Sequence, residues 1–135
     1  MKGAVFLDTG IFVAALARRD THHFEAVELF GRPRTKWTTS VLVVSECYSL
    51  VLHRHGEEAA RRFRAFLSDL AGLKLLAASL EDHKRTLHML DRFRGAGLTY
   101  VDAASLAFIE ALGIDTVWST DHHLGLTGAE ILPRS

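Results

Sequence analysis

Four acidic residues occupy positions from which an acidic side chain can do chemistry. Asp8 directly follows a short apolar run, Asp121 follows a predicted strand, Asp102 lies in the first turn of a predicted helix, and Glu46 interrupts an apolar stretch. Carboxylates that converge raise at least one pKa among them, and a hard divalent cation relieves this repulsion. Oxygen ligands favour Mg²⁺ or Mn²⁺ over Zn²⁺. If these acids meet, we expect metal-assisted hydrolysis of a phosphodiester, in which a metal-activated water attacks and no covalent nucleophile is needed.

Each acid also has a local structural explanation. Asp8 can close an Asx-turn, Asp121 can be a turn residue, and Asp102 can complete a capping box with Thr99. Glu46 is the least ordinary of the acids, because a carboxylate buried alone costs several kcal/mol, by order of magnitude, unless a cation or hydrogen-bond donors compensate it. Taken singly, only Asp8 favours a functional interpretation, whereas the ordered set of acids favours a shared site.

Apolar patterns predict strands alternating with helices. Strands are predicted at 4–7, 36–39, 116–119 and 130–132, with a short strand or a connection at 73–77. Helices are predicted at 11–17, 22–30, 41–53, before Gly72, from Ser79 to Phe93 and at 100–112. Ser40 and Gly113 are predicted as caps, and Ser79 with Asp82 as a capping box. This order predicts an α/β fold with a mostly parallel sheet covered by helices on both faces.

Length and composition predict one soluble domain spanning residues 1–135. The chain has a mass of 15.0 kDa and nearly half of its residues are hydrophobic, which is enough for a core. A single cysteine, Cys47, excludes an internal disulfide and favours a cytoplasmic location. The apolar run before Asp8 is too short for a signal peptide or a membrane span, so no membrane association is expected.

The charge is zero overall but unevenly distributed. Residues 54–94 hold nine Lys and Arg against six acids (+3), whereas residues 95–135 hold one Arg against five acids (−4). An acidic pocket beside a phosphate-binding rim produces such asymmetry, and so do solvated helix faces. Both interpretations stay open for seven of these nine basic side chains, namely Arg61, Arg62, Arg64, Lys84, Arg85, Arg92 and Arg94.

Three other kinds of site are disfavoured. The eight histidines include no His-Glu-x-x-His pattern and Cys47 has no partner cysteine, which argues against zinc, although His122 beside Asp121 keeps a possible role near a phosphate. Asp-Thr-Gly occurs in aspartic proteases, but these are almost entirely β proteins. A haloacid-dehalogenase-like phosphatase requires a second Asp where Gly10 stands.

Four segments together resemble the acidic motifs of PIN-domain nucleases, especially VapC-like toxins. The resemblance covers nearly the whole chain, and the ordered set is more specific than any single member. One difference is that many relatives carry Ser or Asn where this chain has Gly10, two residues after the first Asp. The segments are Phe6-Leu7-Asp8-Thr9, Ser45-Glu46, Leu98-Thr99-Tyr100-Val101-Asp102-Ala103 and Ser119-Thr120-Asp121.

The resemblance implies a three-layer α/β/α PIN-like fold and an endoribonuclease dependent on Mg²⁺ or Mn²⁺ that cuts single-stranded RNA. It further implies a toxin that forms homodimers and is inhibited by a small antitoxin protein. The alternative is a PIN-like domain that binds RNA or protein without cutting. By position, the implied catalytic and metal-binding residues are Asp8, Glu46, Asp102 and Asp121, supported by Thr9 and Ser119.

Overall fold

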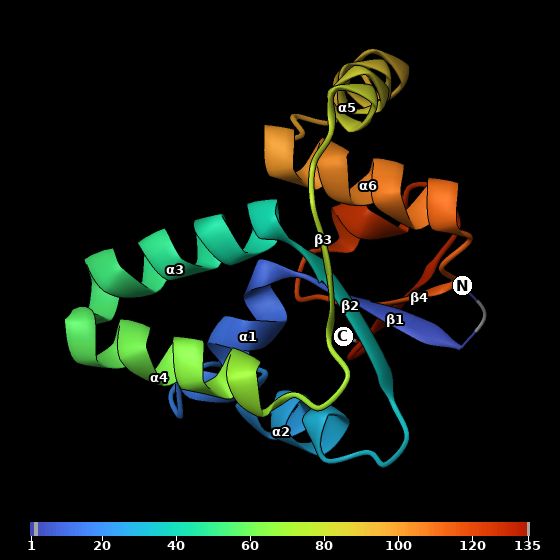
Figure 1. The fold of residues 1–135 in the computed structure, drawn as a ribbon. Helices are drawn as coiled ribbons and strands as arrows, with labels where there is room; N and C mark the ends of the chain where they lie inside the picture. The colour runs from blue at the N-terminus through green and yellow to red at the C-terminus, as the bar shows by residue number, and fades with distance from the viewer. Residues whose placement is uncertain (2, 135) are drawn as a thin grey trace.

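The computed structural model describes Met1 and residues 3–134 and contains one five-stranded sheet (Figure 1). The strand order is β3-β2-β1-β4-β5, and every neighbouring pair is parallel. The strands are β1 (Ala4–Leu7), β2 (Lys36–Ser40), β3 (Lys74–Leu76), β4 (Thr116–Trp118) and β5 (Glu130–Leu132).

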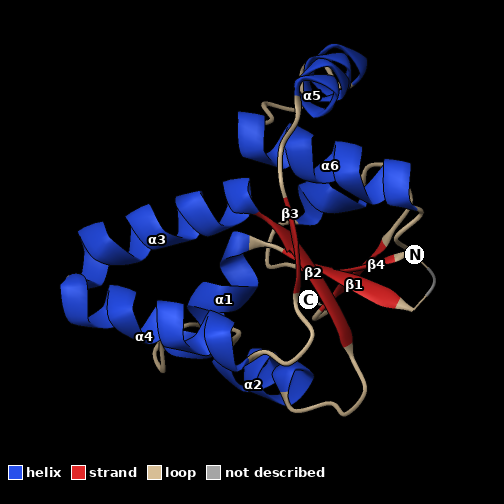
Figure 2. Cartoon of the chain, viewed as in Figure 1, coloured by secondary structure: helices blue, strands red, loops and turns tan. Residues whose placement is uncertain are grey.

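Helices flank this sheet on both sides. Figure 2 shows α5 and α6 on one side and α1, α2 and α4 on the other, so the predicted three-layer α/β/α arrangement is confirmed. Within the described chain, no helix has the length and apolar character needed to cross a membrane. The helices are α1 (Thr9–Leu16), α2 (His23–Phe30), α3 (Val41–His55), α4 (Glu57–Asp69), α5 (Leu80–Arg92), α6 (Tyr100–Leu112) and the short 3₁₀ helix η1 (His122–Gly125).

The core fixes the ends of the two central strands. All four residues of β1 are buried, as expected for a parallel strand covered on both faces. On one face, Trp118 packs edge-to-face against Phe30, with ring centroids 5.3 Å apart, and Phe12 packs against Phe63 at 5.5 Å. On the other face, residues 103–109 of α6 are buried without interruption. The carboxyl ends of β1 and β4 are therefore held from both layers.

Local sequence signals located most element ends correctly. Ser40 caps α3, Gly113 ends α6 in the left-handed conformation, and the box of Ser79 and Asp82 opens α5. Each of these signals acts within a few residues of the end that it specifies. Caps were therefore predictable without knowledge of the tertiary structure.

Some boundaries were predicted wrongly. Helix α4 ends at Asp69 rather than at Gly72, because the chain already leaves helical geometry at Leu70 and Gly72 serves the following turn with φ +75°. Helix α1 starts at Thr9, two residues before its predicted start. The segment after β4, predicted as a turn, continues into the 3₁₀ helix η1. Strand β4 ends at Trp118, so Ser119 lies beyond the strand.

Candidate metal centre

The strand order reverses at β1. From β1 the sheet extends through β2 to β3 on one side, and β4 and β5 follow later on the other side. Open α/β sheets bind ligands at such reversals, beyond the carboxyl ends of the strands. Asp8 follows β1 and Ser119 follows β4, and the register pairs Leu7 with Trp118 immediately before them. Both side chains therefore lie where the strand order reverses, beyond the carboxyl ends of β1 and β4.

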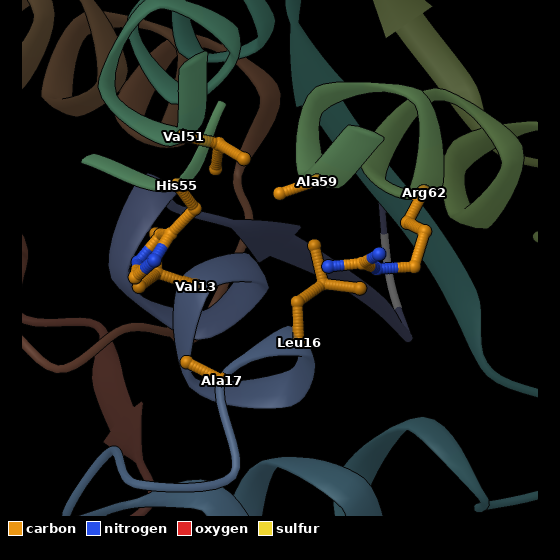
Figure 3. Close-up of a pocket in the computed structure, with 7 residues that line it drawn as sticks. All are labelled: Val13, Leu16, Ala17, Val51, His55, Ala59 and Arg62. Carbon is orange, nitrogen blue, oxygen red and sulfur yellow. The ribbon is translucent and has the colours of Figure 1, made fainter. Parts of the chain in front are cut away.

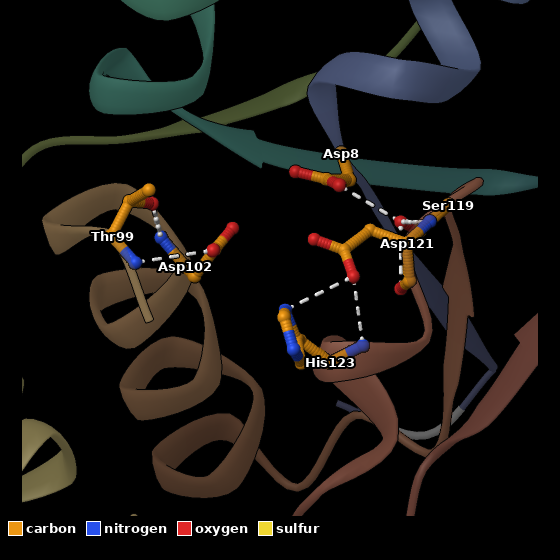
Figure 4. Close-up of polar contacts among 6 residues, drawn as sticks. All are labelled: Asp8, Thr99, Asp102, Ser119, Asp121 and His123. Carbon is orange, nitrogen blue, oxygen red and sulfur yellow. Dashed lines mark hydrogen bonds and ion pairs between the residues drawn. The ribbon is translucent and has the colours of Figure 1, made fainter. Parts of the chain in front are cut away.

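Asp8 is the most enclosed of the four acids. It is only 5% exposed, and its Oδ2 accepts a 2.8 Å hydrogen bond from Ser119 Oγ (Figure 4). Although Asp8 occupies the N-cap position of α1, its side chain does not cap that helix. The side chain of the residue after β4 thus holds the carboxylate, together with the Thr9 N–H.

Burial raises the pKa of Asp8 to about 6. Hydrogen bonds from the Ser119 hydroxyl and the Thr9 N–H oppose the rise, whereas the charges of Asp102 and Glu46 add to it. Among the described residues, no Lys, Arg or His nitrogen forms an ion pair with Asp8. A cation beside these carboxylates would favour the charged form of Asp8 and lower its pKa.

Glu46 reaches the same region from α3. That helix starts directly after β2, because the Ser40 hydroxyl accepts a 3.2 Å hydrogen bond from the Val43 N–H. Glu46 is half-buried, and its Oε1 accepts a 2.6 Å hydrogen bond from Thr9 Oγ1. Thr9 is adjacent to Asp8, so the first turn of α1 links the first two acids.

Asp102 and Asp121 form a second pair together with His123. A carboxylate oxygen of each acid and a ring nitrogen of His123 lie within 4.8 Å of one another. Asp102 is held by its capping box, in which the Thr99 N–H donates to Oδ2 at 3.2 Å. Asp121 Oδ1 accepts from the His123 N–H at 2.9 Å and lies 3.3 Å from His123 Nδ1 (Figure 4).

Ser119 joins the two halves of the site. Its Oγ donates to Asp8 and accepts a 2.9 Å hydrogen bond from the Asp121 N–H. Asp102 and Glu46 lie close enough to Asp8 for their charges to act on its pKa. The structure thus brings the four predicted acids to one end of the sheet. A cluster of carboxylate oxygens suits a hard divalent ion such as Mg²⁺ or Mn²⁺.

His123 was not assigned to the site from the sequence, which considered His122 instead. The ring of His123 returns to Asp121 because Asp121 caps η1 and the following 3₁₀ turn reverses the chain. An Asp that caps a short turn, followed two residues later by His, is the sequence signal that points to this contact. Such a signal is weak without knowledge of the turn.

The neighbouring cysteine offers no nucleophile. Cys47 is fully buried, and burial raises its pKa to about 12, with the charges of Glu46 and Asp8 adding to the rise. A thiol with this pKa stays protonated at neutral pH and is therefore a poor nucleophile and metal ligand. The carboxylates, with any ion that they bind, are therefore the groups that can take part in chemistry at this site.

Several basic side chains of the middle segment are engaged on helix surfaces. Lys84 and Arg85 pair with acids one turn earlier on α5, at 3.5 and 3.3 Å, and Arg92 pairs with Glu110 of α6 at 2.8 Å. Exposed pairs of this kind contribute little energy. For these three residues the geometry favours solvated helix faces over a dedicated phosphate site.

A separate hollow of about 100 Å³ lies between α1, α3 and α4 (Figure 3). Its walls are mostly apolar, and no carboxylate of the described residues lines it, so it does not extend the acid cluster. The lining residues are Val13, Leu16, Ala17, Val51, His55, Ala59 and Arg62.

The solved structures that resemble this chain include the following three. VapC20 of Mycobacterium tuberculosis, described as a sarcin-ricin loop cleaving toxin, has a TM-score of 0.84 and 23% identity, covering 93% of this chain and 96% of that chain. A toxin-antitoxin complex from Klebsiella pneumoniae has a TM-score of 0.69 and 17% identity, covering 96% and 95%. VapBC2 from Rickettsia felis, bound to a DNA fragment from the promoter, has a TM-score of 0.64 and 16% identity, covering 95% and 96%.

These identities are low, so the three structures establish the fold alone. No curated protein sequence matches the chain. The PIN domain family, however, matches residues 5–129, a span that includes all four acids. The chain therefore belongs to the PIN domain family.

Proposed function

We propose that this chain is a divalent-metal-dependent endoribonuclease that hydrolyses phosphodiester bonds of single-stranded RNA. The observation that carries the proposal is the gathering of acids around buried Asp8, which has no ion-pair partner in the described part of the chain. Membership of the PIN domain family supports the nuclease class. The catalytic unit is one PIN-like domain spanning residues 1–135.

In this proposal the carboxylates of Asp8, Glu46, Asp102 and Asp121 hold Mg²⁺ or Mn²⁺. A bound ion of this kind activates water and neutralises charge that develops on the phosphate. Thr9 and Ser119 act as positioning residues, because their hydroxyls donate to Glu46 and Asp8 and restrict how these carboxylates rotate.

The test is cleavage of a labelled single-stranded RNA with Mn²⁺ by the wild type and by Asp8→Asn. Asparagine keeps the shape of the side chain and removes the buried charge, so the variant should fold. We expect a loss of at least about 100-fold, because even residues that only support metal ligands cost 10–100-fold. Asp82→Asn, which changes a partly buried acid on α5, is the control for loss of one negative charge.

Two outcomes would defeat the catalytic role. Equal cleavage by the wild type and Asp8→Asn would assign the activity to another site or to a contaminant. Absence of cleavage by the wild type would favour the alternative, a PIN-like domain that binds RNA or protein without cutting.

We further propose a cytoplasmic toxin that forms a homodimer and is inhibited by a small antitoxin. The Klebsiella and Rickettsia structures, which come from toxin–antitoxin systems, support this partner class. An antitoxin that offers Arg or Lys to the acids would replace the missing cationic partner of Asp8. Co-expression with a short adjacent reading frame should relieve growth arrest, and light scattering of the purified chain should give the mass of a dimer. A genome without such a frame would weaken the toxin proposal and leave the nuclease proposal intact.

A further inference from the structure

A cleft of about 500 Å³ with both polar and apolar lining lies beside the turn that carries Asp121. Two of its lining residues, Ser119 and Thr120, belong to the turn that carries Asp121. The cleft thus continues from the candidate metal centre towards β5. Its full lining comprises His22, Ser119, Thr120, His122, Ile131, Pro133 and Arg134.

The lining of this cleft offers nitrogen donors, whereas the acid cluster offers carboxylate acceptors. His22 precedes α2, His122 opens η1 and Arg134 follows β5, so three separate segments bring nitrogen donors to one space. No carboxylate lines the cleft within the described range. Arg134 forms an ion pair with Glu130, but a guanidinium has five N–H donors and can bind a second anion. Arginine is well suited to a phosphate, which it can bind through two parallel hydrogen bonds.

We propose that this cleft binds the RNA strand next to the phosphate that is cut. Arg134 and His22 contact a neighbouring phosphate, and Ile131 and Pro133 provide apolar contact for the attached nucleoside. The inference rests on the proposed nuclease function and extends it, because it states on which side of the acids the strand continues. An acidic peptide would also suit the donors, and the measurement below separates it from RNA.

The experiment measures binding without cleavage. Fluorescence anisotropy of a labelled single-stranded RNA is recorded in EDTA over a range of salt concentrations. We expect Arg134→Gln to weaken binding about tenfold, the effect of losing one hydrogen bond to a charged group. The slope of log affinity against log salt should also fall by about 0.7, the value for one phosphate of a single strand. His22→Gln should weaken binding about fivefold.

Arg61→Gln and Arg64→Gln serve as matched controls, because both arginines are exposed on α4 and neither lines the cleft. Unchanged affinity in both cleft variants, or an equal loss in the α4 variants, would overturn the subsite. So would a wild type that binds an acidic peptide as tightly as the RNA. This binding assay is independent of the cleavage assay described above. If the cleft variants weaken binding but the wild type does not cut RNA, only the nuclease proposal is refuted. If the wild type cuts RNA but the cleft substitutions leave binding unchanged, only the subsite is refuted.

A second inference follows from the close approach of Gly10 and Thr120. Gly10 lies in the first turn of α1 and is not among the glycines with positive φ, so the backbone there does not require glycine. Glycine inside a helix costs about 1 kcal/mol relative to alanine. A Cβ at this position would lie 2.1 Å from Thr120 Oγ1 and 3.3 Å from Thr120 Cβ. The space beside Gly10 is therefore already filled by the Thr120 side chain.

We infer that the absence of a side chain at Gly10 leaves a space, called the socket below, that the Thr120 side chain fills. This contact positions the turn that carries Asp121 against α1. Thr120 is then a positioning residue of the candidate metal centre. The hydroxyl group beside the first turn of α1 is that of Thr120, which follows β4, and not that of a side chain at position 10. The inference concerns which side chains set the geometry of the acids and does not depend on RNA.

A double-mutant cycle tests this socket through Mn²⁺ affinity and melting temperature. We expect Gly10→Ala to lower the Mn²⁺ affinity about tenfold, the effect of disturbing a residue that supports metal ligands. Thr120→Gly should also lower it, and Gly10→Ala should then cause no additional loss. Additive losses in the double variant, or a Gly10→Ala protein that binds Mn²⁺ like the wild type, would overturn the socket. If Gly10→Ala alone does not fold, the variant that combines it with Thr120→Gly decides. Folding of this double variant supports the socket, and failure to fold refutes the socket.

Discussion

Two helices of this protein begin with the same capping box, and only one of the boxes faces the candidate metal centre. Ser79 with Asp82 opens α5, and Thr99 with Asp102 opens α6. In each, the hydroxyl accepts from the N–H of the acid at 3.1 Å, and the carboxylate accepts from the N–H of the cap residue. These reciprocal hydrogen bonds therefore do not distinguish the two boxes.

The surroundings of the two acids differ. Asp82 lies 3.3 Å from Arg85, and hydrogen bonding to the Ser79 N–H, with that cation, lowers its pKa. Asp102 instead lies beside Asp121 and His123, and its charge contributes to the raised pKa of Asp8. A helix cap thus becomes part of a site only when tertiary packing brings further acids to it.

The largest expected difference between the two boxes concerns catalysis. Asp102→Asn should reduce Mn²⁺-dependent RNA cleavage by at least about 100-fold, because it removes a candidate metal ligand. Asp82→Asn changes the same motif on α5 and should leave cleavage within about twofold. Initial rates at saturating Mn²⁺ measure both. Equal losses would mean that the boxes act only through helix stability.

The second difference concerns pH. The pKa of Asp8 rises from 3.8 to about 6 on folding, so the native state holds this proton more tightly than the unfolded state. This shift contributes about 3 kcal/mol to the free energy of unfolding. The contribution is fully present below pH 3.8, the pKa of Asp8 in the unfolded chain, and is lost as pH rises through about 6. Asp82, with its lowered pKa, contributes stability in the opposite direction, which is lost as pH falls through its folded pKa.

We therefore expect the metal-free wild type to lose about 1 kcal/mol of unfolding free energy from Asp8 between pH 5 and pH 7. Urea unfolding of the wild type and of Asp8→Asn at both values measures this contribution as the difference between the two proteins. Saturating Mn²⁺ should remove the loss, because the ion binds the ionised carboxylate. A wild type and variant with the same pH dependence would contradict the raised pKa.

The smallest difference concerns the cap hydroxyls. Ser79→Ala and Thr99→Ala should each lower the unfolding free energy by about 1 kcal/mol, the usual cost of losing a hydroxyl cap. Only Thr99→Ala should also lower Mn²⁺ affinity, because Thr99 holds the backbone of Asp102. Urea unfolding and calorimetric titration provide the two readouts. A loss of Mn²⁺ affinity in Ser79→Ala would show that the two helices are coupled.

The parts of the fold that depend on neighbouring residues were predictable from the sequence. The apolar run at 4–7 and the caps at Ser40 and Gly113 specify their elements within a few residues. The end of α4 was not predictable in this way, because Gly72 marks the turn after the helix and the chain leaves helical geometry at Leu70.

The site was only partly predictable, for a similar reason. The types and order of the acids suggested a cation site, but the contacts that tie the Asp8 region to Glu46 and to Ser119 join distant segments. Thr9 reaches Glu46 across 37 positions and Ser119 reaches Asp8 across 111. The participation of His123 depends on the 3₁₀ turn, and the role of Gly10 depends on a side chain 110 residues later. No local pattern specifies such distances.

The central claim is that four carboxylates share one divalent cation, and paramagnetic broadening by Mn²⁺ tests it most directly. Substoichiometric Mn²⁺ added to ¹⁵N-labelled protein should first broaden the amide signals around Asp8, Glu46, Asp102 and Asp121. The signals around Asp82 should stay sharp, and Asp102→Asn should require more Mn²⁺ for the same effect. Broadening that begins at Asp82, or that spreads evenly over the exposed acids, would contradict the shared site.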